Sequence, residues 1–164
     1  RCYRLRHGRK LGGMIYTALT IQAMKVAYAC HSGQTDKAGM PYIFHPYHIA
    51  EQMTDEVSVC VALLHDVAED SDDPTVTLER LAEEFPPEVM NPLRLLTHTK
   101  GVPYAQYIRA LRDDPVANMV KRADIAHNLN QDRWSGSQPP SSQTIDRLTK
   151  KYTMALDILT GQVD

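Results

Sequence analysis

The chain has 164 residues and a formal net charge of −2, with 43% hydrophobic and 23% charged residues. This composition is ordinary for one compact soluble domain. Five of the basic residues lie within the first ten positions, so the remainder is acidic and lacks the clustered basic face that nucleic-acid binding requires. No apolar run is long enough for a membrane span, and no signal-peptide core is present, so we expect a cytoplasmic protein without a membrane partner.

The N-terminal segment differs from the rest. Because Met14 begins the first helical pattern, we interpret residues 1–13 as an upstream or non-native extension and residues 14–164 as one domain. Cys2, Cys30 and Cys60 are odd in number and lack metal-site spacing. We expect Cys30 and Cys60 to be reduced core thiols.

Apolar residues at helical spacing predict an all-α fold. In the first half of the chain we expect helices over residues 16–32 and 47–53, and a helix that Asp55 caps and that continues through the 59–70 segment. Another helix should run from Thr77 to the Pro86-Pro87 break, and the next should carry Val89, Leu93 and Leu96. The last three should run from Pro103 to Leu111, from Pro115 through Asp124, and over residues 144–159. We expect loops over 33–46 and 135–142, no β-hairpin and no internal repeat.

The segment VALLHDVAED, residues 61–70, ends an apolar run with one imidazole, His65, and three carboxylates, Asp66, Glu69 and Asp70, within six residues. If the segment is one helix, His65 shares a face with Glu69, and Asp66 shares one with Asp70. An acidic helix end leading into a solvated loop would explain Asp72 and Asp73. It explains His65 and Asp66 poorly, because burying such groups is costly unless they are paired or metal-bound.

Two further fragments complete a ligand set. His45 lies in PYIFHP, where Pro46 restrains it from helical geometry and should hold it at the start of the following helix. Asp124 lies in KRADIAHN, one helical turn before Asn128. Asp124 could alternatively be an exposed acid paired with Lys121 or Arg122, but the site needs a further donor, so we assign it as the fourth ligand.

We therefore predict that His45, His65, Asp66 and Asp124 bind one divalent cation. Two imidazoles and two carboxylates suit Mn, Fe, Zn, Co or Ni better than Ca or Mg. Such a cation polarises a phosphoryl oxygen and lowers the pKa of bound water. Glu69 and Asp70 would then position that water or move its proton.

The ordered fragments PYIxHP, LLHDxxED and ADxxHN resemble the hydrolase domain of the bacterial Rel/Spo alarmone enzymes and their small stand-alone relatives, over residues 16 to 133. The resemblance implies a single all-α HD-domain helical bundle that removes the 3′-pyrophosphate of ppGpp and pppGpp using Mn²⁺. It implies metal binding by His45, His65, Asp66 and Asp124, and hydrolysis by Glu69 and Asp70.

The resemblance also implies substrate contacts by Lys37 and Asn128. Lys37 matches the second residue of a basic pair whose first member is usually Arg, but here the first member is Asp36. We interpret Gln34, Tyr42 and His31 as structural. Further candidates for phosphate contact are Lys100, Lys121, Arg122 and Arg133. Tyr104 or Tyr152 could stack on a base, and His127 could support a metal ligand.

These observations predict a stand-alone alarmone hydrolase that acts on a small-molecule nucleotide, with oligomerisation possible. We expect no synthetase domain, because little chain follows the HD unit. Asp36 leaves open a second enzyme, an HD phosphohydrolase that acts on another nucleotide such as NADPH or an adenine alarmone. A third interpretation, from another class, is a non-catalytic nucleotide sensor, and the intact set of metal and hydrolysis residues argues against it.

Overall fold

A computed structural model describes residues 13–71 and 73–163. Within them the α-helices are α1 Ala18–Cys30, α2 Phe44–Ala50, α3 Glu56–Leu64, α4 Val67–Asp70, α5 Leu78–Ala82, α6 Pro87–Leu96, α7 Tyr104–Leu111, α8 Pro115–Leu129 and α9 Ser142–Leu159, and a 3-10 helix, η1, covers Gln131–Trp134. The described residues contain no named strand. A lone bridge between Thr35 and Pro41 closes the loop before α2. The predicted all-α class is confirmed, whereas the interpretation of residues 1–12 lies outside the described residues.

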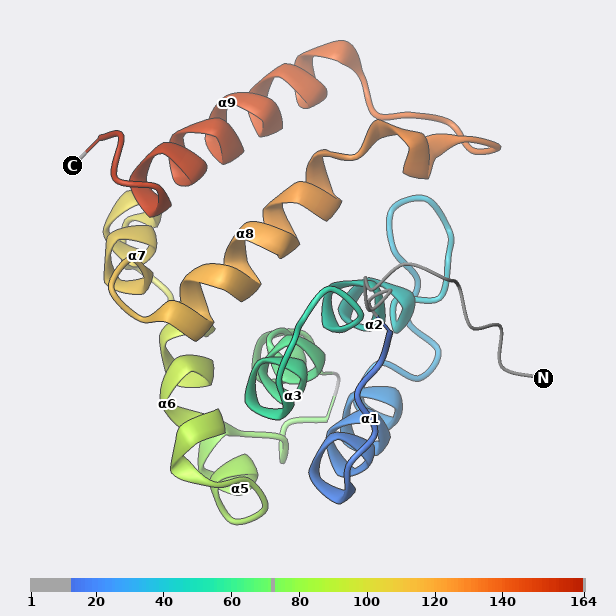
Figure 1. The fold of residues 1–164 in the computed structure, drawn as a ribbon. Coiled ribbons are helices and arrows are strands. Elements are labelled where there is room, and N and C mark those ends of the chain that lie inside the picture. Colours follow the sequence, from blue (N-terminus) through green and yellow to red (C-terminus); the bar gives the residue numbers. More distant parts are fainter. Residues whose placement is uncertain (1–12, 72, 164) are drawn as a thin grey trace, which may run out of the picture.

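Helix α3 lies at the centre of the bundle. Its residues from Ser58 to Leu64 are all buried, as expected for a helix that is apolar on every side. It contacts α1, α2, α6 and α8, while α9 packs along α8 and α7 (Figure 1). The predicted cap is confirmed, because the Asp55 carboxylate accepts a hydrogen bond from the Ser58 amide. The core therefore ends where the polar HD segment begins.

The predicted continuous helix through the HD segment is wrong. Helix α3 ends at Leu64, His65 caps it, and α4 begins at Val67. The His65 Nδ1 lies 2.8 Å from the carbonyl oxygen of Ala62. The last carbonyls of a helix have no amide partner within it, and the His65 side chain supplies a hydrogen bond to this one. The break places His65 and Asp66 at a tight corner, from which both side chains enter one site.

The second predicted helix boundary is also wrong. Helix α2 begins at Phe44, three residues earlier than expected, and contains both His45 and Pro46. Proline is tolerated in a first helical turn, because the amide it lacks would have no partner inside the helix. His45 therefore lies in the first turn of α2 and is buried.

The remaining boundaries differ from expectation only at the ends of helices. Helix α1 starts after a capping box at Thr17 rather than at Tyr16. Cys30 is partly buried, Cys60 is buried, and both are free thiols. Among the described residues, no helix is both long and apolar enough to cross a membrane.

Candidate functional site

Four side chains converge between α2, the α3–α4 corner and α8. The Nε2 atom of His65 lies 2.9 Å from Asp66 Oδ2 and 4.0 Å from Asp124 Oδ1. The Nε2 atom of His45 lies 3.6 Å from Asp66 Oδ2 and 3.2 Å from Asp124 Oδ1. The structure thus brings together all four residues that the sequence predicted as ligands.

These separations fit a metal site. Ligand atoms about 2.1 Å from an octahedral metal lie roughly 3.0 Å apart when adjacent and roughly 4.2 Å apart when opposite. Even without Asp66, the three residues His45, His65 and Asp124 each offer one ligand atom, and these atoms all lie within 4.8 Å of one another. We call these three residues and Asp66 the metal cluster.

The protonation pattern of His65 also fits a ligand. Its Nδ1 contact with the Ala62 carbonyl requires a proton on Nδ1 in the neutral ring, which leaves a lone pair on Nε2. That Nε2 is buried and faces the carboxylates of Asp66 and Asp124, at 2.9 and 4.0 Å. Backbone support of one ring nitrogen is typical of metal-binding histidines. A cation held by the cluster would bind this nitrogen in place of a proton.

The two carboxylates make the cluster favour positive charge. Burial alone would lower the pKa of His65, but Asp66 and Asp124 raise it to about 9. Burial would likewise raise the pKa of Asp66, but His65 holds it at about 2. The pKa of Asp124 is held far below its usual range against burial, chiefly by Lys121. Both carboxylates are therefore ionised and available as ligands.

Residues around the cluster hold these carboxylates in place. The Tyr42 hydroxyl donates to Asp66 Oδ2 at 2.6 Å and lies 3.3 Å from Asp70 Oδ2. The Asn128 amide donates to Asp124 Oδ1 at 2.7 Å. The Lys121 ammonium lies 2.9 Å from the other oxygen, Asp124 Oδ2. The Asp124–Lys121 pair that the sequence offered as an alternative to ligation therefore accompanies the cluster, and both residues are largely buried.

His45 is supported by a second imidazole. Its Nδ1 lies 2.6 Å from His127 Nδ1, so one of these two atoms carries the proton. Burial and the nearby Arg133 lower the pKa of His127 to about 4, which keeps its ring neutral and able to accept. With a proton on His45 Nδ1, which His127 can accept, the Nε2 atom of His45 is left to face the carboxylates. The structure thus places His127 where the sequence suggested a supporting role.

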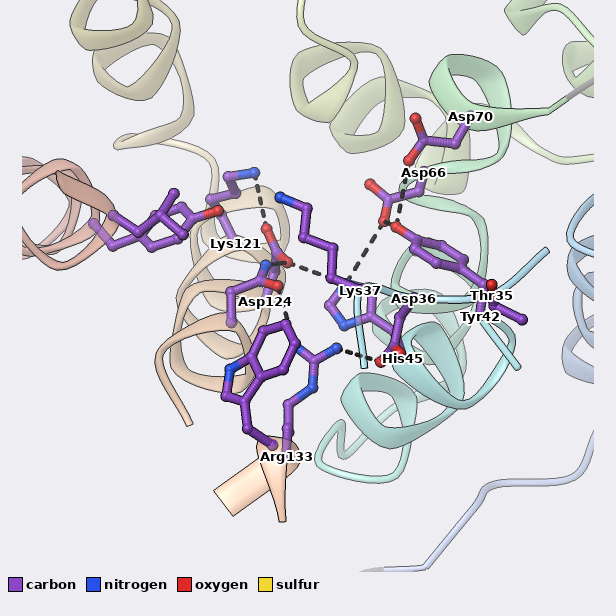
Figure 2. Close-up of a pocket in the computed structure, with 14 residues that line it drawn as sticks. Thr35, Asp36, Lys37, Tyr42, His45, Asp66, Asp70, Lys121, Asp124 and Arg133 are labelled. Carbon is purple, nitrogen blue, oxygen red and sulfur yellow. Dashed lines mark hydrogen bonds and ion pairs between the residues drawn. The ribbon is translucent and has the colours of Figure 1, made fainter. Parts of the chain in front are cut away.

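The cluster opens into a cavity of about 420 Å³, the main pocket (Figure 2). Figure 2 shows Lys121 and Asp124 on one side of it and Tyr42, Asp66 and Asp70 on the other, with Lys37 reaching between them. Its other lining residues are Thr35, Asp36, His45, Asn128, Arg133, Trp134, Leu148 and Tyr152. The volume lies within the usual range of about 300–1,000 Å³ for small-molecule sites.

The main pocket carries four carboxylates and three basic side chains among its lining residues. Without a cation its formal charge is therefore −1, which opposes the binding of a phosphate. A divalent ion at the cluster would reverse this to +1. The charge balance couples anion binding in this pocket to metal binding.

Asp36 has a definite partner. Its Oδ2 lies 2.6 Å from an Arg133 guanidinium nitrogen across the main pocket, 97 positions along the chain. Its Oδ1 accepts from the amides of Ala38 and Met40 at 2.9 and 3.0 Å, which shapes the 33–42 loop. The acidic residue that replaces the family arginine thus brings an arginine from η1 into the same pocket.

The two carboxylates assigned to hydrolysis lie on different cavities. Asp70 lines the main pocket, whereas Glu69 lines a neighbouring cavity of about 250 Å³, the side cavity. Asp66 and Lys121 border both. Glu69 Oε1 accepts from the His98 amide at 2.5 Å. Burial, and to a smaller extent the Asp66 charge, raise the pKa of both Glu69 and Asp70.

Sequence reasoning undervalued several residues of this site. Tyr42 was interpreted as structural, yet its hydroxyl contacts two of the assigned carboxylates. Lys121 was one of several candidate lysines, and its position three residues before Asp124 was the signal that it pairs with that carboxylate. Tyr107 and Lys151 of the side cavity were missed, because nothing in their local sequence marks a site.

The HD domain family matches residues 23–158, so the chain belongs to that family, as the motifs predicted. Among its relatives is the probable GTP pyrophosphokinase of Mycobacterium leprae (strain TN), 33% identical over 135 residues, which are 74% of this chain and 16% of that protein. Another is the putative GTP diphosphokinase RSH1, chloroplastic, of Oryza sativa subsp. japonica, 43% identical over 67 residues, 38% of this chain and 7% of that protein. The chain thus spans about a sixth or less of these relatives.

One solved structure shares the fold. It is described as "A metazoan ortholog of SpoT hydrolyzes ppGpp and plays a role in starvation responses". The match has a TM-score of 0.72 and 24% sequence identity, and it covers 91% of this chain and 89% of that one. This likeness confirms the arrangement of helices predicted for an HD-domain bundle.

Proposed function

We propose that the chain is a metal-dependent phosphohydrolase that removes the 3′-pyrophosphate of guanosine alarmones, converting ppGpp and pppGpp to GDP and GTP. The observation that carries the proposal is the convergence of His45, His65, Asp66 and Asp124 beside the main pocket, which three of them line. The relatives named as GTP pyrophosphokinases and the fold shared with a ppGpp-hydrolysing protein support guanosine nucleotides as the substrate class.

The resident cation would be held by His45, His65, Asp66 and Asp124, and we propose Mn²⁺, which this mixed nitrogen and oxygen set suits. When bound, it would act as a Lewis acid toward a phosphoryl oxygen and make a bound water easier to deprotonate. The buried Nε2 of His65, which faces the carboxylates of Asp66 and Asp124, supports this assignment.

The reaction needs one proton taken from water and one given to the sugar. Water attacks the phosphorus attached to the 3′-oxygen, the bond between that oxygen and phosphorus breaks, and the new oxygen leaves in pyrophosphate. We assign Glu69, in the side cavity, to accept the proton of the water. We assign Asp70, in the main pocket, to protonate the 3′-oxygen. Burial raises the pKa of both groups, which makes each carboxylate a stronger base.

The nucleoside would occupy the main pocket. Lys37 reaches into it (Figure 2), and Trp134 and Tyr152 line it, so we propose Lys37 for phosphate contact and an aromatic face for the base. Asn128 both lines this pocket and donates to Asp124. We therefore propose that it couples a substrate contact to the orientation of a ligand.

Asp36 favours a second candidate, hydrolysis of another nucleotide such as NADPH or an adenine alarmone. Its pairing with Arg133 changes the charge pattern at one wall of the main pocket. The metal chemistry would be the same, and only recognition of the base and outer phosphates would differ. The two candidates therefore predict different products from the same cluster.

The test is a substrate panel with Mn²⁺-loaded protein, in which GDP, pyrophosphate and orthophosphate are quantified separately. GDP and pyrophosphate from ppGpp support the proposal, whereas orthophosphate from NADPH supports the second candidate. Asp66→Ala is the inactive control, and Asp113→Ala, which alters a carboxylate that is 92% exposed, is the matched active one. Tight nucleotide binding without turnover would contradict both candidates and indicate a sensor.

A further inference from the structure

The side cavity adjoins the metal cluster. It is lined by His65, Asp66 and Glu69 from the α3–α4 corner, by Lys121 of α8, and by Tyr104 and Lys151 of α7 and α9, among others. Its volume of about 250 Å³ lies below the range of about 300–1,000 Å³ usual for a whole small ligand. It shares Asp66 and Lys121 with the main pocket, so one part of a ligand can enter it while the rest stays outside.

Lys151 brings positive charge to this cavity without an anionic partner. Its ammonium lies over the rings of Tyr104 and Tyr152, 4.1 and 5.5 Å from their centroids, and it makes no ion pair with any described residue. Burial and the charges of Lys121, Arg147 and Lys37 lower its pKa. These cations act against Asp124, which attracts Lys151, and an anion bound beside Lys151 would offset their repulsion.

Tyr104 presents an unused donor in the same place. Its hydroxyl oxygen is buried and has no hydrogen-bond partner among the described residues. The neighbouring Tyr107, in contrast, donates its hydroxyl to the Leu96 carbonyl at 2.5 Å. Leaving a buried hydroxyl unpaired is energetically unfavourable. A ligand oxygen that accepts from Tyr104 would remove this cost.

We infer that the side cavity is a subsite for a terminal phosphate, and that it holds the outer phosphate of a pyrophosphate group whose inner phosphate lies at the metal cluster. Lys151 and Tyr104 supply a charge and a donor beyond the cluster, and Lys121 links the two positions. The subsite distinguishes a pyrophosphate ligand from a single phosphate. The inference rests on the proposed function for the identity of the substrate, but the subsite can be tested without turnover.

The test measures the affinity of the Mn²⁺-loaded chain for inorganic pyrophosphate and for orthophosphate by calorimetry. The test variant is Lys151→Met, and the matched control is Lys150→Met, which changes the neighbouring lysine of the same helix; both lysines are exposed, but only Lys151 lines the side cavity. Lys151→Met should weaken pyrophosphate binding about tenfold or more, as expected for loss of a charged phosphate contact, and change orthophosphate binding less than about twofold. Lys150→Met should leave both affinities unchanged. Equal weakening of both anions, or none, would overturn the subsite.

A second variant tests the subsite without changing the packing of side chains. Tyr104→Phe removes only the buried hydroxyl, so the fold and the bound manganese should be retained. It should weaken pyrophosphate binding by about three- to tenfold, which is the loss of one net hydrogen bond, and again spare orthophosphate. An unchanged pyrophosphate affinity in this variant would show that the hydroxyl has no anionic partner.

The outcomes separate the subsite from the proposed function. If ppGpp is not hydrolysed but pyrophosphate binding still depends on Lys151, the proposed substrate is wrong and the subsite stands. If ppGpp is hydrolysed and Lys151→Met changes neither the pyrophosphate affinity nor the KM for ppGpp, the subsite is wrong and the proposed function stands.

Discussion

The two ends of the main pocket are built differently. The metal cluster lies on packed helices and the corner between two of them: His45 in the first turn of α2, His65 and Asp66 at the α3–α4 corner, and Asp124 within α8. The opposite wall lies on the 33–42 loop and η1, where Asp36 and Arg133 pair across 97 positions. Packed helices fix the reactive groups, whereas loops adjust what the pocket admits. Substitutions at the two ends should therefore fail in different ways.

The largest effect is expected for Asp66→Ala. Asp66 Oδ2 lies within 3.6 Å of both histidine Nε2 atoms, so its loss opens the cluster on one side. Manganese affinity should fall by at least about 100-fold, the upper end of the effect seen when only a supporting partner is lost, and turnover should fall with it. Metal content measured by mass spectrometry after dialysis checks this. Retention of stoichiometric manganese would contradict the assignment of Asp66.

Glu69→Gln should separate chemistry from metal binding. Glu69 lines the side cavity and is held by the His98 amide, so the variant keeps its shape but cannot accept a proton. The kcat should fall about 10²–10⁴-fold, the usual contribution of general base catalysis, while manganese content stays unchanged. Glu79→Gln, at a side chain that is 80% exposed, is the control. If metal content and rate fall together, the assigned role of Glu69 is wrong.

Tyr42→Phe should weaken the metal site without opening it. The lost hydroxyl donates to Asp66 at 2.6 Å, and loss of such a supporting partner costs about 10–100-fold in metal affinity. Titration of the apoprotein with Mn²⁺ measures the effect. Tyr28→Phe, at a residue that is 65% exposed, should bind manganese like the unmodified chain. Equal affinities in the two variants would show that Tyr42 does not orient the ligand.

Asp36→Asn should give the smallest effect, and one that depends on pH. Burial opposes ionisation of Asp36, but Arg133 and the backbone amides lower its pKa below the ordinary value. Because the pKa of Asp36 is lower in the folded state than in the unfolded state, the ionised carboxylate stabilises the fold at pH values above the unfolded pKa of about 3.9. This stabilisation is lost as the pH falls through the folded pKa. At neutral pH the variant should lose about 1 kcal/mol or less, because the pair is only partly buried.

Thermal unfolding from pH 7 down to pH 3 tests this expectation. The difference in Tm between Asp36→Asn and the unmodified chain should be full at pH 7 and shrink below about pH 4. Manganese affinity should stay unchanged, because Asp36 does not contact the cluster. A Tm difference that grows toward low pH, or a loss of manganese, would show that the two ends of the pocket are not independent.

The metal end could be predicted from the sequence, because its ligands stand at fixed places in short motifs next to apolar runs. The helix break after Leu64 could not, because residues 61–70 have the same periodicity whether or not the helix continues. The side chain of His65, which binds the Ala62 carbonyl, decides the matter. The start of α2 was also misplaced, because the restriction before a proline is weaker in a first helical turn.

The loop end was much less predictable. The Asp36–Arg133 pair joins two segments that are distant in sequence, and only the packing of α2 against α8 brings them together. The side cavity shows the same limit, since Tyr104, Lys121 and Lys151 come from three different helices. Motifs report local chemistry, whereas groups assembled from separate helices need the tertiary structure.

The most direct test of the account is hydrolysis of ppGpp by the Mn²⁺-loaded chain in water labelled with oxygen-18. Attack of water on the phosphorus next to the 3′-oxygen predicts GDP without label and pyrophosphate with one labelled oxygen. Label in the 3′-hydroxyl of GDP would contradict the proposed attack. Failure to form GDP and pyrophosphate while manganese is bound would contradict the account of the site as an alarmone hydrolase.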